Sequence, residues 1–353
     1  MRKMQEYIVK GNKIFIGLED SKKTWKVCVR CDGMIVHETS MPAKYEVLQA
    51  YLWHKYPECG ITVMYEAGFQ GFWLHDLLEA DGIKCIVTPP NKVTMPKVNR
   101  VKTDKRDARR LAKNLENGDY VSCTVPDCER REDRQIVRTL DQIQQDIKRV
   151  KNWVRRCLDF HGLNEGLKVG AWTDKDYLRI RAIGIPGPVG FCLELYLSLL
   201  EKFREAEKTL KGQLLSLCDK DRYADSVELK RTVPGVGWLT AIRLTLEWGD
   251  MRRFPSGKHI ASYTGLTSSE YSSGEKVLRG RITCQGNNFV RGWLIECAWR
   301  AIKKDPALLH KFMTVWKNSG SKKKAAVAVA RKLAVRMWAI EIQQTPYCIG
   351  VAE

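Results

Sequence analysis

Four acidic residues in the first third of the chain carry the clearest chemical signal. Asp104 and Asp107 stand three apart in the stretch KTDKRDARRLA, and their side chains share one face if a helix begins here. Glu19 lies at the end of the predicted strand KIFIGLED, and Glu66 ends the predicted strand GITVMYE. Side chains at strand ends and on a facing helix can converge at one edge of a sheet. We therefore predict that these four carboxylates form one cluster.

A cluster of this kind suits hard divalent cations, because Mg²⁺ and Mn²⁺ take oxygen ligands. Two ions held about 4 Å apart activate a nucleophile and stabilise the leaving oxygen in phosphoryl transfer. Without a cation, converging carboxylates repel one another. Taken alone, Asp104 and Asp107 are better explained by a helix N-cap and an ordinary ion pair. Glu66, placed after a buried strand, reverses that balance in favour of Mg²⁺ or Mn²⁺ binding.

The segment around the two aspartates is strongly basic. Eight Lys or Arg lie between Met95 and Asn114, and the whole chain has 60 Lys and Arg against 41 Asp and Glu, a net charge of +19. A polyanion is the expected partner, because each phosphate that is neutralised releases counterions. Acids that bind cations among bases that bind phosphate indicate a nuclease-like surface. The bases assigned to nucleic acid here are Lys102, Lys105, Arg106 and Arg109.

Strand and helix signals alternate from residue 13 to about 120. The first two strands are predicted to form a hairpin, and a third strand follows them. After these come a helix over 43–56, the strand that ends at Glu66, a helix ended by Gly82 and a last strand. We expect an α/β domain over residues 1–125, with a mixed sheet flanked by helices. At 353 residues the chain is long enough for two or three domains.

Residues 126–225 read as a helical arm. Helices are predicted over 130–159 and 191–218, with a Gly-rich connection between them, and together they resemble an antiparallel coiled coil. Such an arm can mediate dimerisation or can be a plain helical linker. Because its heptads are irregular, the sequence favours neither function over the other. The remainder, 226–353, reads as a mainly helical domain. Its Gly-x-Gly turn in VPGVGWLTA precedes a helix and can present backbone N–H groups to phosphate.

The sequence shows no membrane or secretion signal. The N-terminus lacks an unbroken apolar stretch, and the apolar run over 183–200 is interrupted by two prolines and a glutamate. The twelve cysteines follow no disulfide spacing, which indicates a reducing cytosol. Cys28 and Cys31 form a CxxC pair, but residues three apart in a strand point to opposite faces, so a zinc site is not favoured.

Several motifs resemble one transposase family. IGLEDSKKTW, MYEAGFQGFW and KTDKRDARRLA resemble the three acidic motifs of the DEDD transposases of the IS110 insertion-sequence family, which includes a site-specific DNA invertase. VPGVGWLTA, RRFPSGKHIASYTGL, YSSG, GRIT and GN resemble its second conserved domain. The resemblance covers most of the chain except the arm. It implies an RNase H-like (RuvC-like) first domain, a C-terminal serine transposase domain, and a DNA transposase or site-specific recombinase that acts by phosphoryl transfer.

Carried over motif by motif, the family's catalytic, metal-binding acids fall on Glu19, Glu66, Asp104 and Asp107. The family has Asp at the first position, and the extra methylene of Glu19 moves its carboxylate by roughly 1.5 Å, one C–C bond. Asp20 follows directly, but strand alternation should turn it to the opposite face. The first ligand therefore stays open between Glu19 and Asp20.

The resemblance also implies a nucleophilic serine just before a glycine, which is Ser273 in YSSG. A serine oxygen that attacks a DNA phosphate stores the bond energy as a phosphoserine link, so strands are exchanged without a high-energy cofactor. From the residues alone, a loop serine is more often a turn residue. Its competitors are Ser272 and, more weakly, Ser268 and Ser269. The cations expected to neutralise the developing charge are Lys276, Arg279 and Arg281.

Members of the family are guided by a structured non-coding RNA, the bridge RNA, whose loops pair with donor and target DNA. They form composite active sites in a dimer of dimers. When base pairing reads the sequence, a protein makes mainly backbone and shape contacts, which agrees with many Lys and Arg and no obvious recognition helix. Tryptophans that would stack bases, although most tryptophans belong to cores, are Trp73, Trp153, Trp172 and Trp238.

Three functions remain open at this point. The first, which we favour, is an RNA-guided, Mg²⁺-dependent recombinase of a mobile element that uses Ser273. The second is a hydrolytic nuclease, such as a junction resolvase, in which metal-activated water cuts DNA. The third is an inactive nucleic-acid-binding descendant, suggested by the departure at Glu19. A covalent protein–DNA adduct lost on Ser273→Ala would separate the first from the second.

Overall fold

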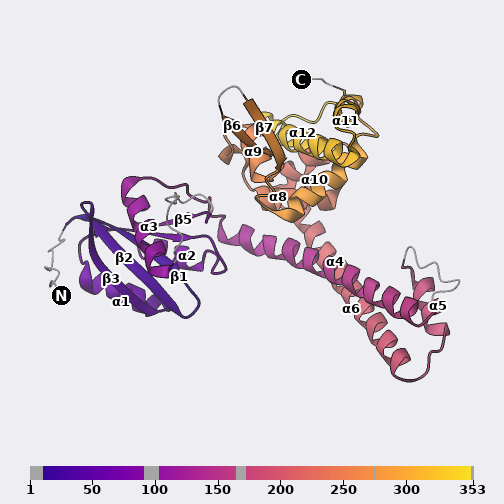
Figure 1. Cartoon of the computed structure of the whole chain (residues 1–353), viewed down its shortest axis with the longest axis horizontal. Helices are drawn as coiled ribbons and strands as arrows, with labels where there is room; N and C mark the ends of the chain where they lie inside the picture. The colour runs from indigo at the N-terminus through magenta and orange to yellow at the C-terminus, as the bar shows by residue number, and fades with distance from the viewer. Residues whose placement is uncertain (1–10, 91–102, 164–171, 274–275, 351–353) are drawn as a thin grey trace. The chain divides into compact units, whose positions relative to one another are not determined.

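The computed structural model describes residues 11–90, 103–163, 172–273 and 276–350, and between 271 and 279 it describes no side chains (Figure 1). The chain divides into two compact units, Met1–Pro126 and Asp127–Glu353. In the first unit a five-stranded mixed sheet has the order β3-β2-β1-β4-β5. Strand β1 is antiparallel to β2 and parallel to β4. The strands are β1 (Lys13–Asp20), β2 (Thr24–Cys31), β3 (Met34–Pro42), β4 (Gly60–Glu66) and β5 (Lys84–Thr88).

Helices cover both faces of this sheet. On one face α1 (Tyr45–Lys55) and α2 (Trp73–Ala80) pack on a core that includes Ile16 and Leu18 of β1. On the other face α3 (Asp104–Asn117) packs through Leu111 and Leu115 against Met64 of β4. Successive side chains of a strand point to opposite faces, so one strand serves both cores. The predicted mixed α/β organisation is confirmed.

Helix α3 crosses β1 at Gly17, where the two backbones nearly touch. A Cβ atom at Gly17 would lie 2.1 Å from the carbonyl oxygen of Ala108 and 2.3 Å from the amide nitrogen of Ala112. Only glycine permits this approach. Because the crossing point is fixed at Gly17, the first turn of α3 lies over the C-terminal end of β1. This role of Gly17 was not predicted from the sequence.

In the second unit the two long helices α4 (Cys128–Phe160) and α6 (Gly187–Cys218) pack antiparallel (Figure 1). Val137 of α4 shares a core with Leu214 near the end of α6, whereas Val154 shares one with Leu193 near its start. Helix α6 begins four residues before the predicted position because a proline in the first turn costs no backbone hydrogen bond. Whether the pair forms a true coiled coil stays a prediction.

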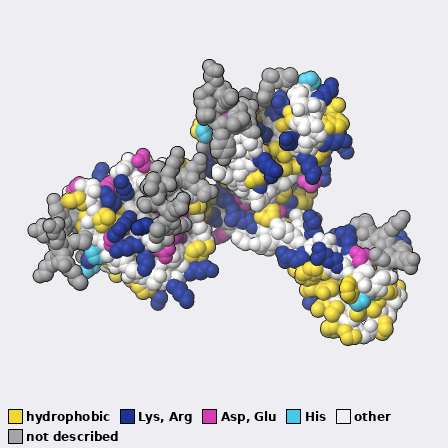
Figure 2. All heavy atoms as spheres, in the orientation of Figure 1, with side chains coloured by type: hydrophobic (Ala, Val, Ile, Leu, Met, Phe, Trp, Pro, Cys, Tyr) yellow, Lys and Arg dark blue, Asp and Glu magenta, His cyan; other side chains and the backbone are white. Residues whose placement is uncertain are grey.

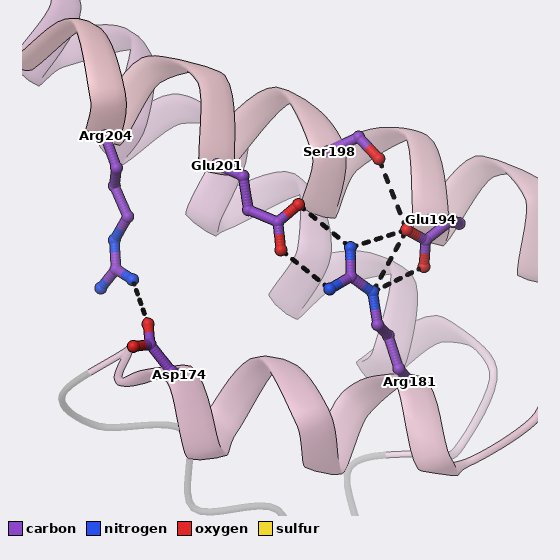
Figure 3. Close-up of polar contacts among 6 residues, drawn as sticks. All are labelled: Asp174, Arg181, Glu194, Ser198, Glu201 and Arg204. Atoms are coloured by element: carbon purple, nitrogen blue, oxygen red, sulfur yellow. Dashed lines mark hydrogen bonds and ion pairs between the residues drawn. The ribbon is translucent and has the colours of Figure 1, made fainter.

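The connection between α4 and α6 contains a helix that the sequence analysis missed, α5 (Asp174–Ala182). Its signal was Thr173 followed three residues later by Asp176, which form a capping box. Figure 3 shows how α5 is joined to α6: Arg181 donates to Glu194 at 2.7 Å and to Glu201 at 2.8 Å. These side chains are partly exposed, so the network fixes the position of α5 more than it adds stability.

The rest of the second unit is mainly helical, as predicted, around a core that includes Val329 and Leu333. One departure is a two-stranded antiparallel hairpin, β6–β7, where the sequence analysis expected a loop. The elements are α7 (Asp221–Arg231), α8 (Trp238–Trp248), the 3₁₀ helix η1 (Met251–Arg253), α9 (Gly257–Tyr263), β6 (Ser268–Ser273), β7 (Lys276–Ile282), α10 (Asn288–Ala301), α11 (Pro306–Ser319) and α12 (Lys322–Gln343).

Candidate active site

The ends of β1 and β4 place Glu19 and Glu66 side by side. The two strands are parallel and pair Leu18 with Tyr65, so the two glutamates occupy the next position of each strand. Leu18 and Tyr65 belong to the core under α1 and α2. By alternation, Glu19 and Glu66 therefore point to the opposite face, which α3 covers.

Helix α3 brings the two aspartates to the same face of the sheet. Asp107 is 4% exposed, whereas Asp104 is exposed in the first turn of the helix. Thr103, not Asp104, is the N-cap residue, and no side-chain hydrogen bond caps this end. The alternative reading of Asp104 as an N-cap is therefore wrong. As acidic residues of the first turn, Asp104 and Asp107 stabilise the helix N-terminus through its dipole.

The charges of neighbouring acids disfavour the ionisation of Glu19. The pKa of Glu19 is raised to about 7, first by burial and then by the charges of Glu66, Asp107, Asp20 and Asp104, in that order. Like charges disfavour ionisation only when they lie close together. The other three predicted acids, Glu66, Asp107 and Asp104, therefore lie within electrostatic reach of Glu19.

Asp20 lies on the other face of β1, as strand alternation predicted. It is 7% exposed beside the core of α1 and α2, and its Oδ2 atom has no hydrogen-bond partner among the described residues. Burial is the main cause that raises its pKa to about 6, although a backbone hydrogen bond opposes the shift. Glu19, and not Asp20, faces the helix that carries Asp107.

Arg110 lies between two of the acids, a contact that the sequence analysis did not foresee. Its Nη2 atom donates a hydrogen bond of 2.9 Å to Oε1 of Glu66 and lies 3.1 Å from Oδ1 of Asp107. Within the described ranges, no three His, Cys, Asp or Glu side chains are arranged to hold one metal ion. The carboxylates fit a divalent cation in chemistry and charge, but Arg110 takes up two of their oxygens.

The basic residues of α3 have a second acidic partner, Glu38 of β3. Arg109 Nη2 donates to Glu38 Oε2 at 2.7 Å, and Lys105 Nζ lies 3.3 Å from the same oxygen. Their side chains are still 44% and 61% exposed, so both can meet a phosphate. Arg106 is exposed as well, and Lys102 lies outside the described residues.

Ser273 ends β6 and pairs in register with Lys276, the first residue of β7. Ser272 pairs with Val277. The side chains of these serines, of Lys276 and of Arg279 lie outside the description, whereas Arg281 is exposed. Of the weaker candidates, Ser269 donates a hydrogen bond of 3.2 Å to the carbonyl oxygen of Arg281, which gives it a structural role.

Comparison with known proteins identifies the family. A DEDD transposase model of the IS110 type matches residues 16–162, and the model of the transposase IS116/IS110/IS902 family matches residues 227–313. The chain belongs to the IS110 family of DEDD transposases. Proteins of this family are DNA transposases, enzymes that cleave DNA and transfer strands. A DEDD domain implies the use of a divalent metal ion.

Individual relatives agree. The chain is 29% identical over 309 residues to y4qE of Sinorhizobium fredii, a protein named as a transposase. The alignment covers 80% of this chain and 76% of y4qE. The chain is 23% identical over 343 residues to the transposase of element IS1533 of Leptospira borgpetersenii, covering 92% and 94%. It is 30% identical over 138 residues, 38% and 42% of the two chains, to a pilin gene-inverting protein of Moraxella lacunata.

Other sequence candidates in this transposase divide between core and surface. Trp172 is 2% exposed and Trp238 packs against the core, whereas Trp73 and Trp153 are each 40% exposed. Cys28 and Cys31 belong to different cores, as expected for residues three apart in a strand. All twelve cysteines are free. Over the ranges that the structure describes, no helix is long and apolar enough to cross a membrane.

The Gly-x-Gly turn precedes α8, as predicted, and borders a cavity of about 410 Å³. Gly235 and Gly237 line this cavity together with Arg243, Trp293 and Arg300. Gly235 has φ of +87° and lies against α10, where a Cβ atom would be 2.8 Å from the carbonyl oxygen of Cys297. A glycine is therefore needed at position 235 for close packing against α10, whether or not the turn also contacts phosphate.

Proposed function

We propose that this transposase is an RNA-guided DNA recombinase that cuts and rejoins strands through a serine–phosphodiester intermediate. Its first unit would act as an RNase H-like (RuvC-like) catalytic domain. The observation that carries the proposal is the convergence of Glu19 and Glu66, at the ends of adjacent parallel strands, with Asp107 of the basic helix α3. A cluster of acids that raises the pKa of its own member is costly unless a cation uses it.

The acids that would hold Mg²⁺ or Mn²⁺ are Glu19, Glu66, Asp104 and Asp107. The ion would supply charge stabilisation at the phosphate and an activated nucleophile. Because Glu19 faces α3 and Asp20 faces the opposite core, we assign the first ligand to Glu19. The longer Glu19 side chain would then reach the cluster from a position where the family has Asp.

The second unit would supply the nucleophile. The Ser273 oxygen bonds to phosphorus, the deoxyribose oxygen leaves with a proton, and the phosphoserine link retains the bond energy for rejoining. Ser273 pairs in register with Lys276, so a cationic residue stands across the hairpin from the nucleophile. Arg279 and Arg281 follow in the same strand and would neutralise the charge that develops.

The proposed partners are donor and target DNA, a structured guide RNA and further copies of the chain. The net charge of +19 supports binding of both nucleic acids.

Figure 2 shows hydrophobic side chains gathered at the end of the arm where α4 ends and α6 begins. Exposed apolar surface of this kind supports assembly with another copy, within the bacterial cytoplasm where the DNA lies. The exposed residues are Trp153, Phe160, Leu178, Phe191 and Leu195. The arm and the serine domain would be separate functional parts, 126–225 and 226–353.

The name of the relative from Moraxella lacunata, a pilin gene-inverting protein, favours rejoining over hydrolysis. A gel under denaturing conditions tests this with purified protein, Mg²⁺, labelled DNA and guide RNA. We expect a covalent protein–DNA adduct from the wild type and from Ser272→Ala, and none from Ser273→Ala. Cleavage by the wild type without an adduct would contradict the serine mechanism and favour the hydrolytic nuclease.

A further inference from the structure

One guanidinium nitrogen of Arg110 contacts two members of the acidic cluster. Nη2 lies 2.9 Å from Oε1 of Glu66 and 3.1 Å from Oδ1 of Asp107. The three side chains are 14%, 18% and 6% exposed, so water screens these contacts only in part. The two acids come from different elements, β4 and α3, and Arg110 therefore ties the helix to the strand end.

The neighbouring cations of α3 do not share this position. Arg109 and Lys105 are directed to Glu38 of β3 and are largely exposed. Arg109 and Arg110 are adjacent in sequence and carry the same charge, yet they meet different acids. Successive residues of a helix point about 100° apart, which explains the division. The chain thus offers a matched pair of arginines that differ in what they contact.

We infer that Arg110 is a positioning residue that holds Glu66 and Asp107 in place and competes with the divalent cation for their oxygens. The inference rests on the proposed metal site. A guanidinium is always charged and binds carboxylates through directed N–H groups. A divalent ion requires carboxylate oxygens at about 2.0–2.6 Å. Two positive groups cannot both occupy the space beside Oε1 of Glu66 and Oδ1 of Asp107 without strong repulsion.

Cation binding therefore requires Arg110 to move away from at least one acid. Arg110 lowers the affinity of the site for metal and balances the charge of the acids before the metal binds. Removal of its charge should tighten metal binding, although removal of a residue near an active site ordinarily weakens it. This reversed sign distinguishes competition from a purely structural role.

Titration of the chelator-treated, full-length protein with Mn²⁺, followed by electron paramagnetic resonance, tests the inference. Arg110→Met keeps most of the apolar stem and removes the charge, and we expect it to bind Mn²⁺ about tenfold more tightly or more. Arg110→Gln, which keeps a hydrogen-bond donor, should change in the same direction. Arg110→Lys retains the charge and Arg109→Met removes one directed to Glu38, so both should stay within about threefold of the wild type.

Thermal unfolding with and without Mn²⁺ shows that each variant is folded, and Asp107→Asn reports on the site itself. Equal or weaker Mn²⁺ binding by folded Arg110→Met and Arg110→Gln, with binding lost in Asp107→Asn, would overturn the inference alone. No Mn²⁺ binding by the wild type, or binding that Asp107→Asn leaves unchanged, would overturn the proposed metal site and the inference with it.

Discussion

The two units of the chain treat buried acids in different ways. In the second unit each of several buried acids has its own cation: Glu247 pairs with Arg134 at 2.7 Å, and Asp305 pairs with Arg336 at 3.1 Å. In the first unit the charges of Glu66, Asp104 and Asp107 act on Glu19, and Arg110 contacts only Glu66 and Asp107. Negative charge is balanced locally at these pairs of the second unit and is in excess at the acidic cluster of the first unit.

The direction of the pKa shifts follows this difference. Burial alone would raise the pKa of Glu247, but Arg134 and Arg138 lower it overall. In Glu19 burial and the neighbouring acids act in the same direction, and the pKa rises to about 7. Asp141 of the second unit departs from this contrast, because burial raises its pKa to about 6 although Arg243 lies 3.3 Å away and lowers it. Paired acids serve the fold, whereas an unbalanced group costs stability and indicates a functional site.

The largest expected effect is on activity in the first unit. Asp107→Asn should lower strand cleavage by roughly 10³-fold, because bound metal contributes several kcal/mol and each 1.4 kcal/mol is a factor of ten. Its melting temperature should change little, because Arg110 keeps Glu66 as a partner and the lost repulsion among the acids offsets the lost ion pair with Arg110. Cleavage assays and thermal unfolding measure both. Asp119→Asn, an exposed position after α3, is the control. A large loss of stability in Asp107→Asn would place this acid with the structural ones.

Glu247→Gln should show the opposite behaviour in the second unit. The substitution leaves Arg134, which is 14% exposed, without its counter-charge, so the free energy of unfolding should fall by about 3 kcal/mol. Chemical denaturation measures it. Glu228→Gln removes an exposed acid that pairs with Arg231 and should change stability by less than about 1 kcal/mol. Equal effects of the two substitutions would remove the contrast between buried and exposed pairs.

Gly17→Ala tests how the acidic site is assembled. The added methyl group would meet the backbone of α3, so we expect a loss of about 2 kcal/mol from displacement of the helix. Strand cleavage should fall as well, because Asp107 moves with the helix. Gly212→Ala is the matched control: it lies inside α6 with no atom near the new Cβ and should stabilise by about 0.5–1 kcal/mol. Normal cleavage by Gly17→Ala would show that α3 need not be fixed at this point.

The smallest effect concerns pH. Folding raises the pKa of Glu19 from 4.5 to about 7, so between these values the folded state binds more protons than the unfolded state. Stability from this group therefore falls as pH rises from 5 to 7. Glu19→Gln lacks this dependence. On acidification from pH 7 to 5 the melting temperature of the wild type should therefore rise relative to that of the variant. Parallel curves for the two proteins would contradict the raised pKa.

Much of the first unit followed from local pattern. Alternation predicted the strands that end at Glu66 and beside Glu19, and it also placed Asp20 on the opposite face. By contrast, the hairpin β6–β7 and helix α5 were not predicted. The hairpin has polar residues along β6, which give no apolar alternation, and α5 depends on a capping box within a Gly-rich stretch. Local signals fail where tertiary contacts supply the stability.

The sequence by itself determined which acids are available, the family to which the chain belongs and the opposite faces of β1 on which Glu19 and Asp20 lie, because residue type and a period of two are local properties. Only the tertiary structure decided that α3 crosses β1 at Gly17, that Thr103 is the N-cap of this helix, and that Arg110 rather than Arg109 meets the acids. These facts depend on how closely two backbones approach and on the rotation of one helix about its axis. The spacing of residues along one segment predicts neither quantity, since both are set by packing between segments that are distant in the chain.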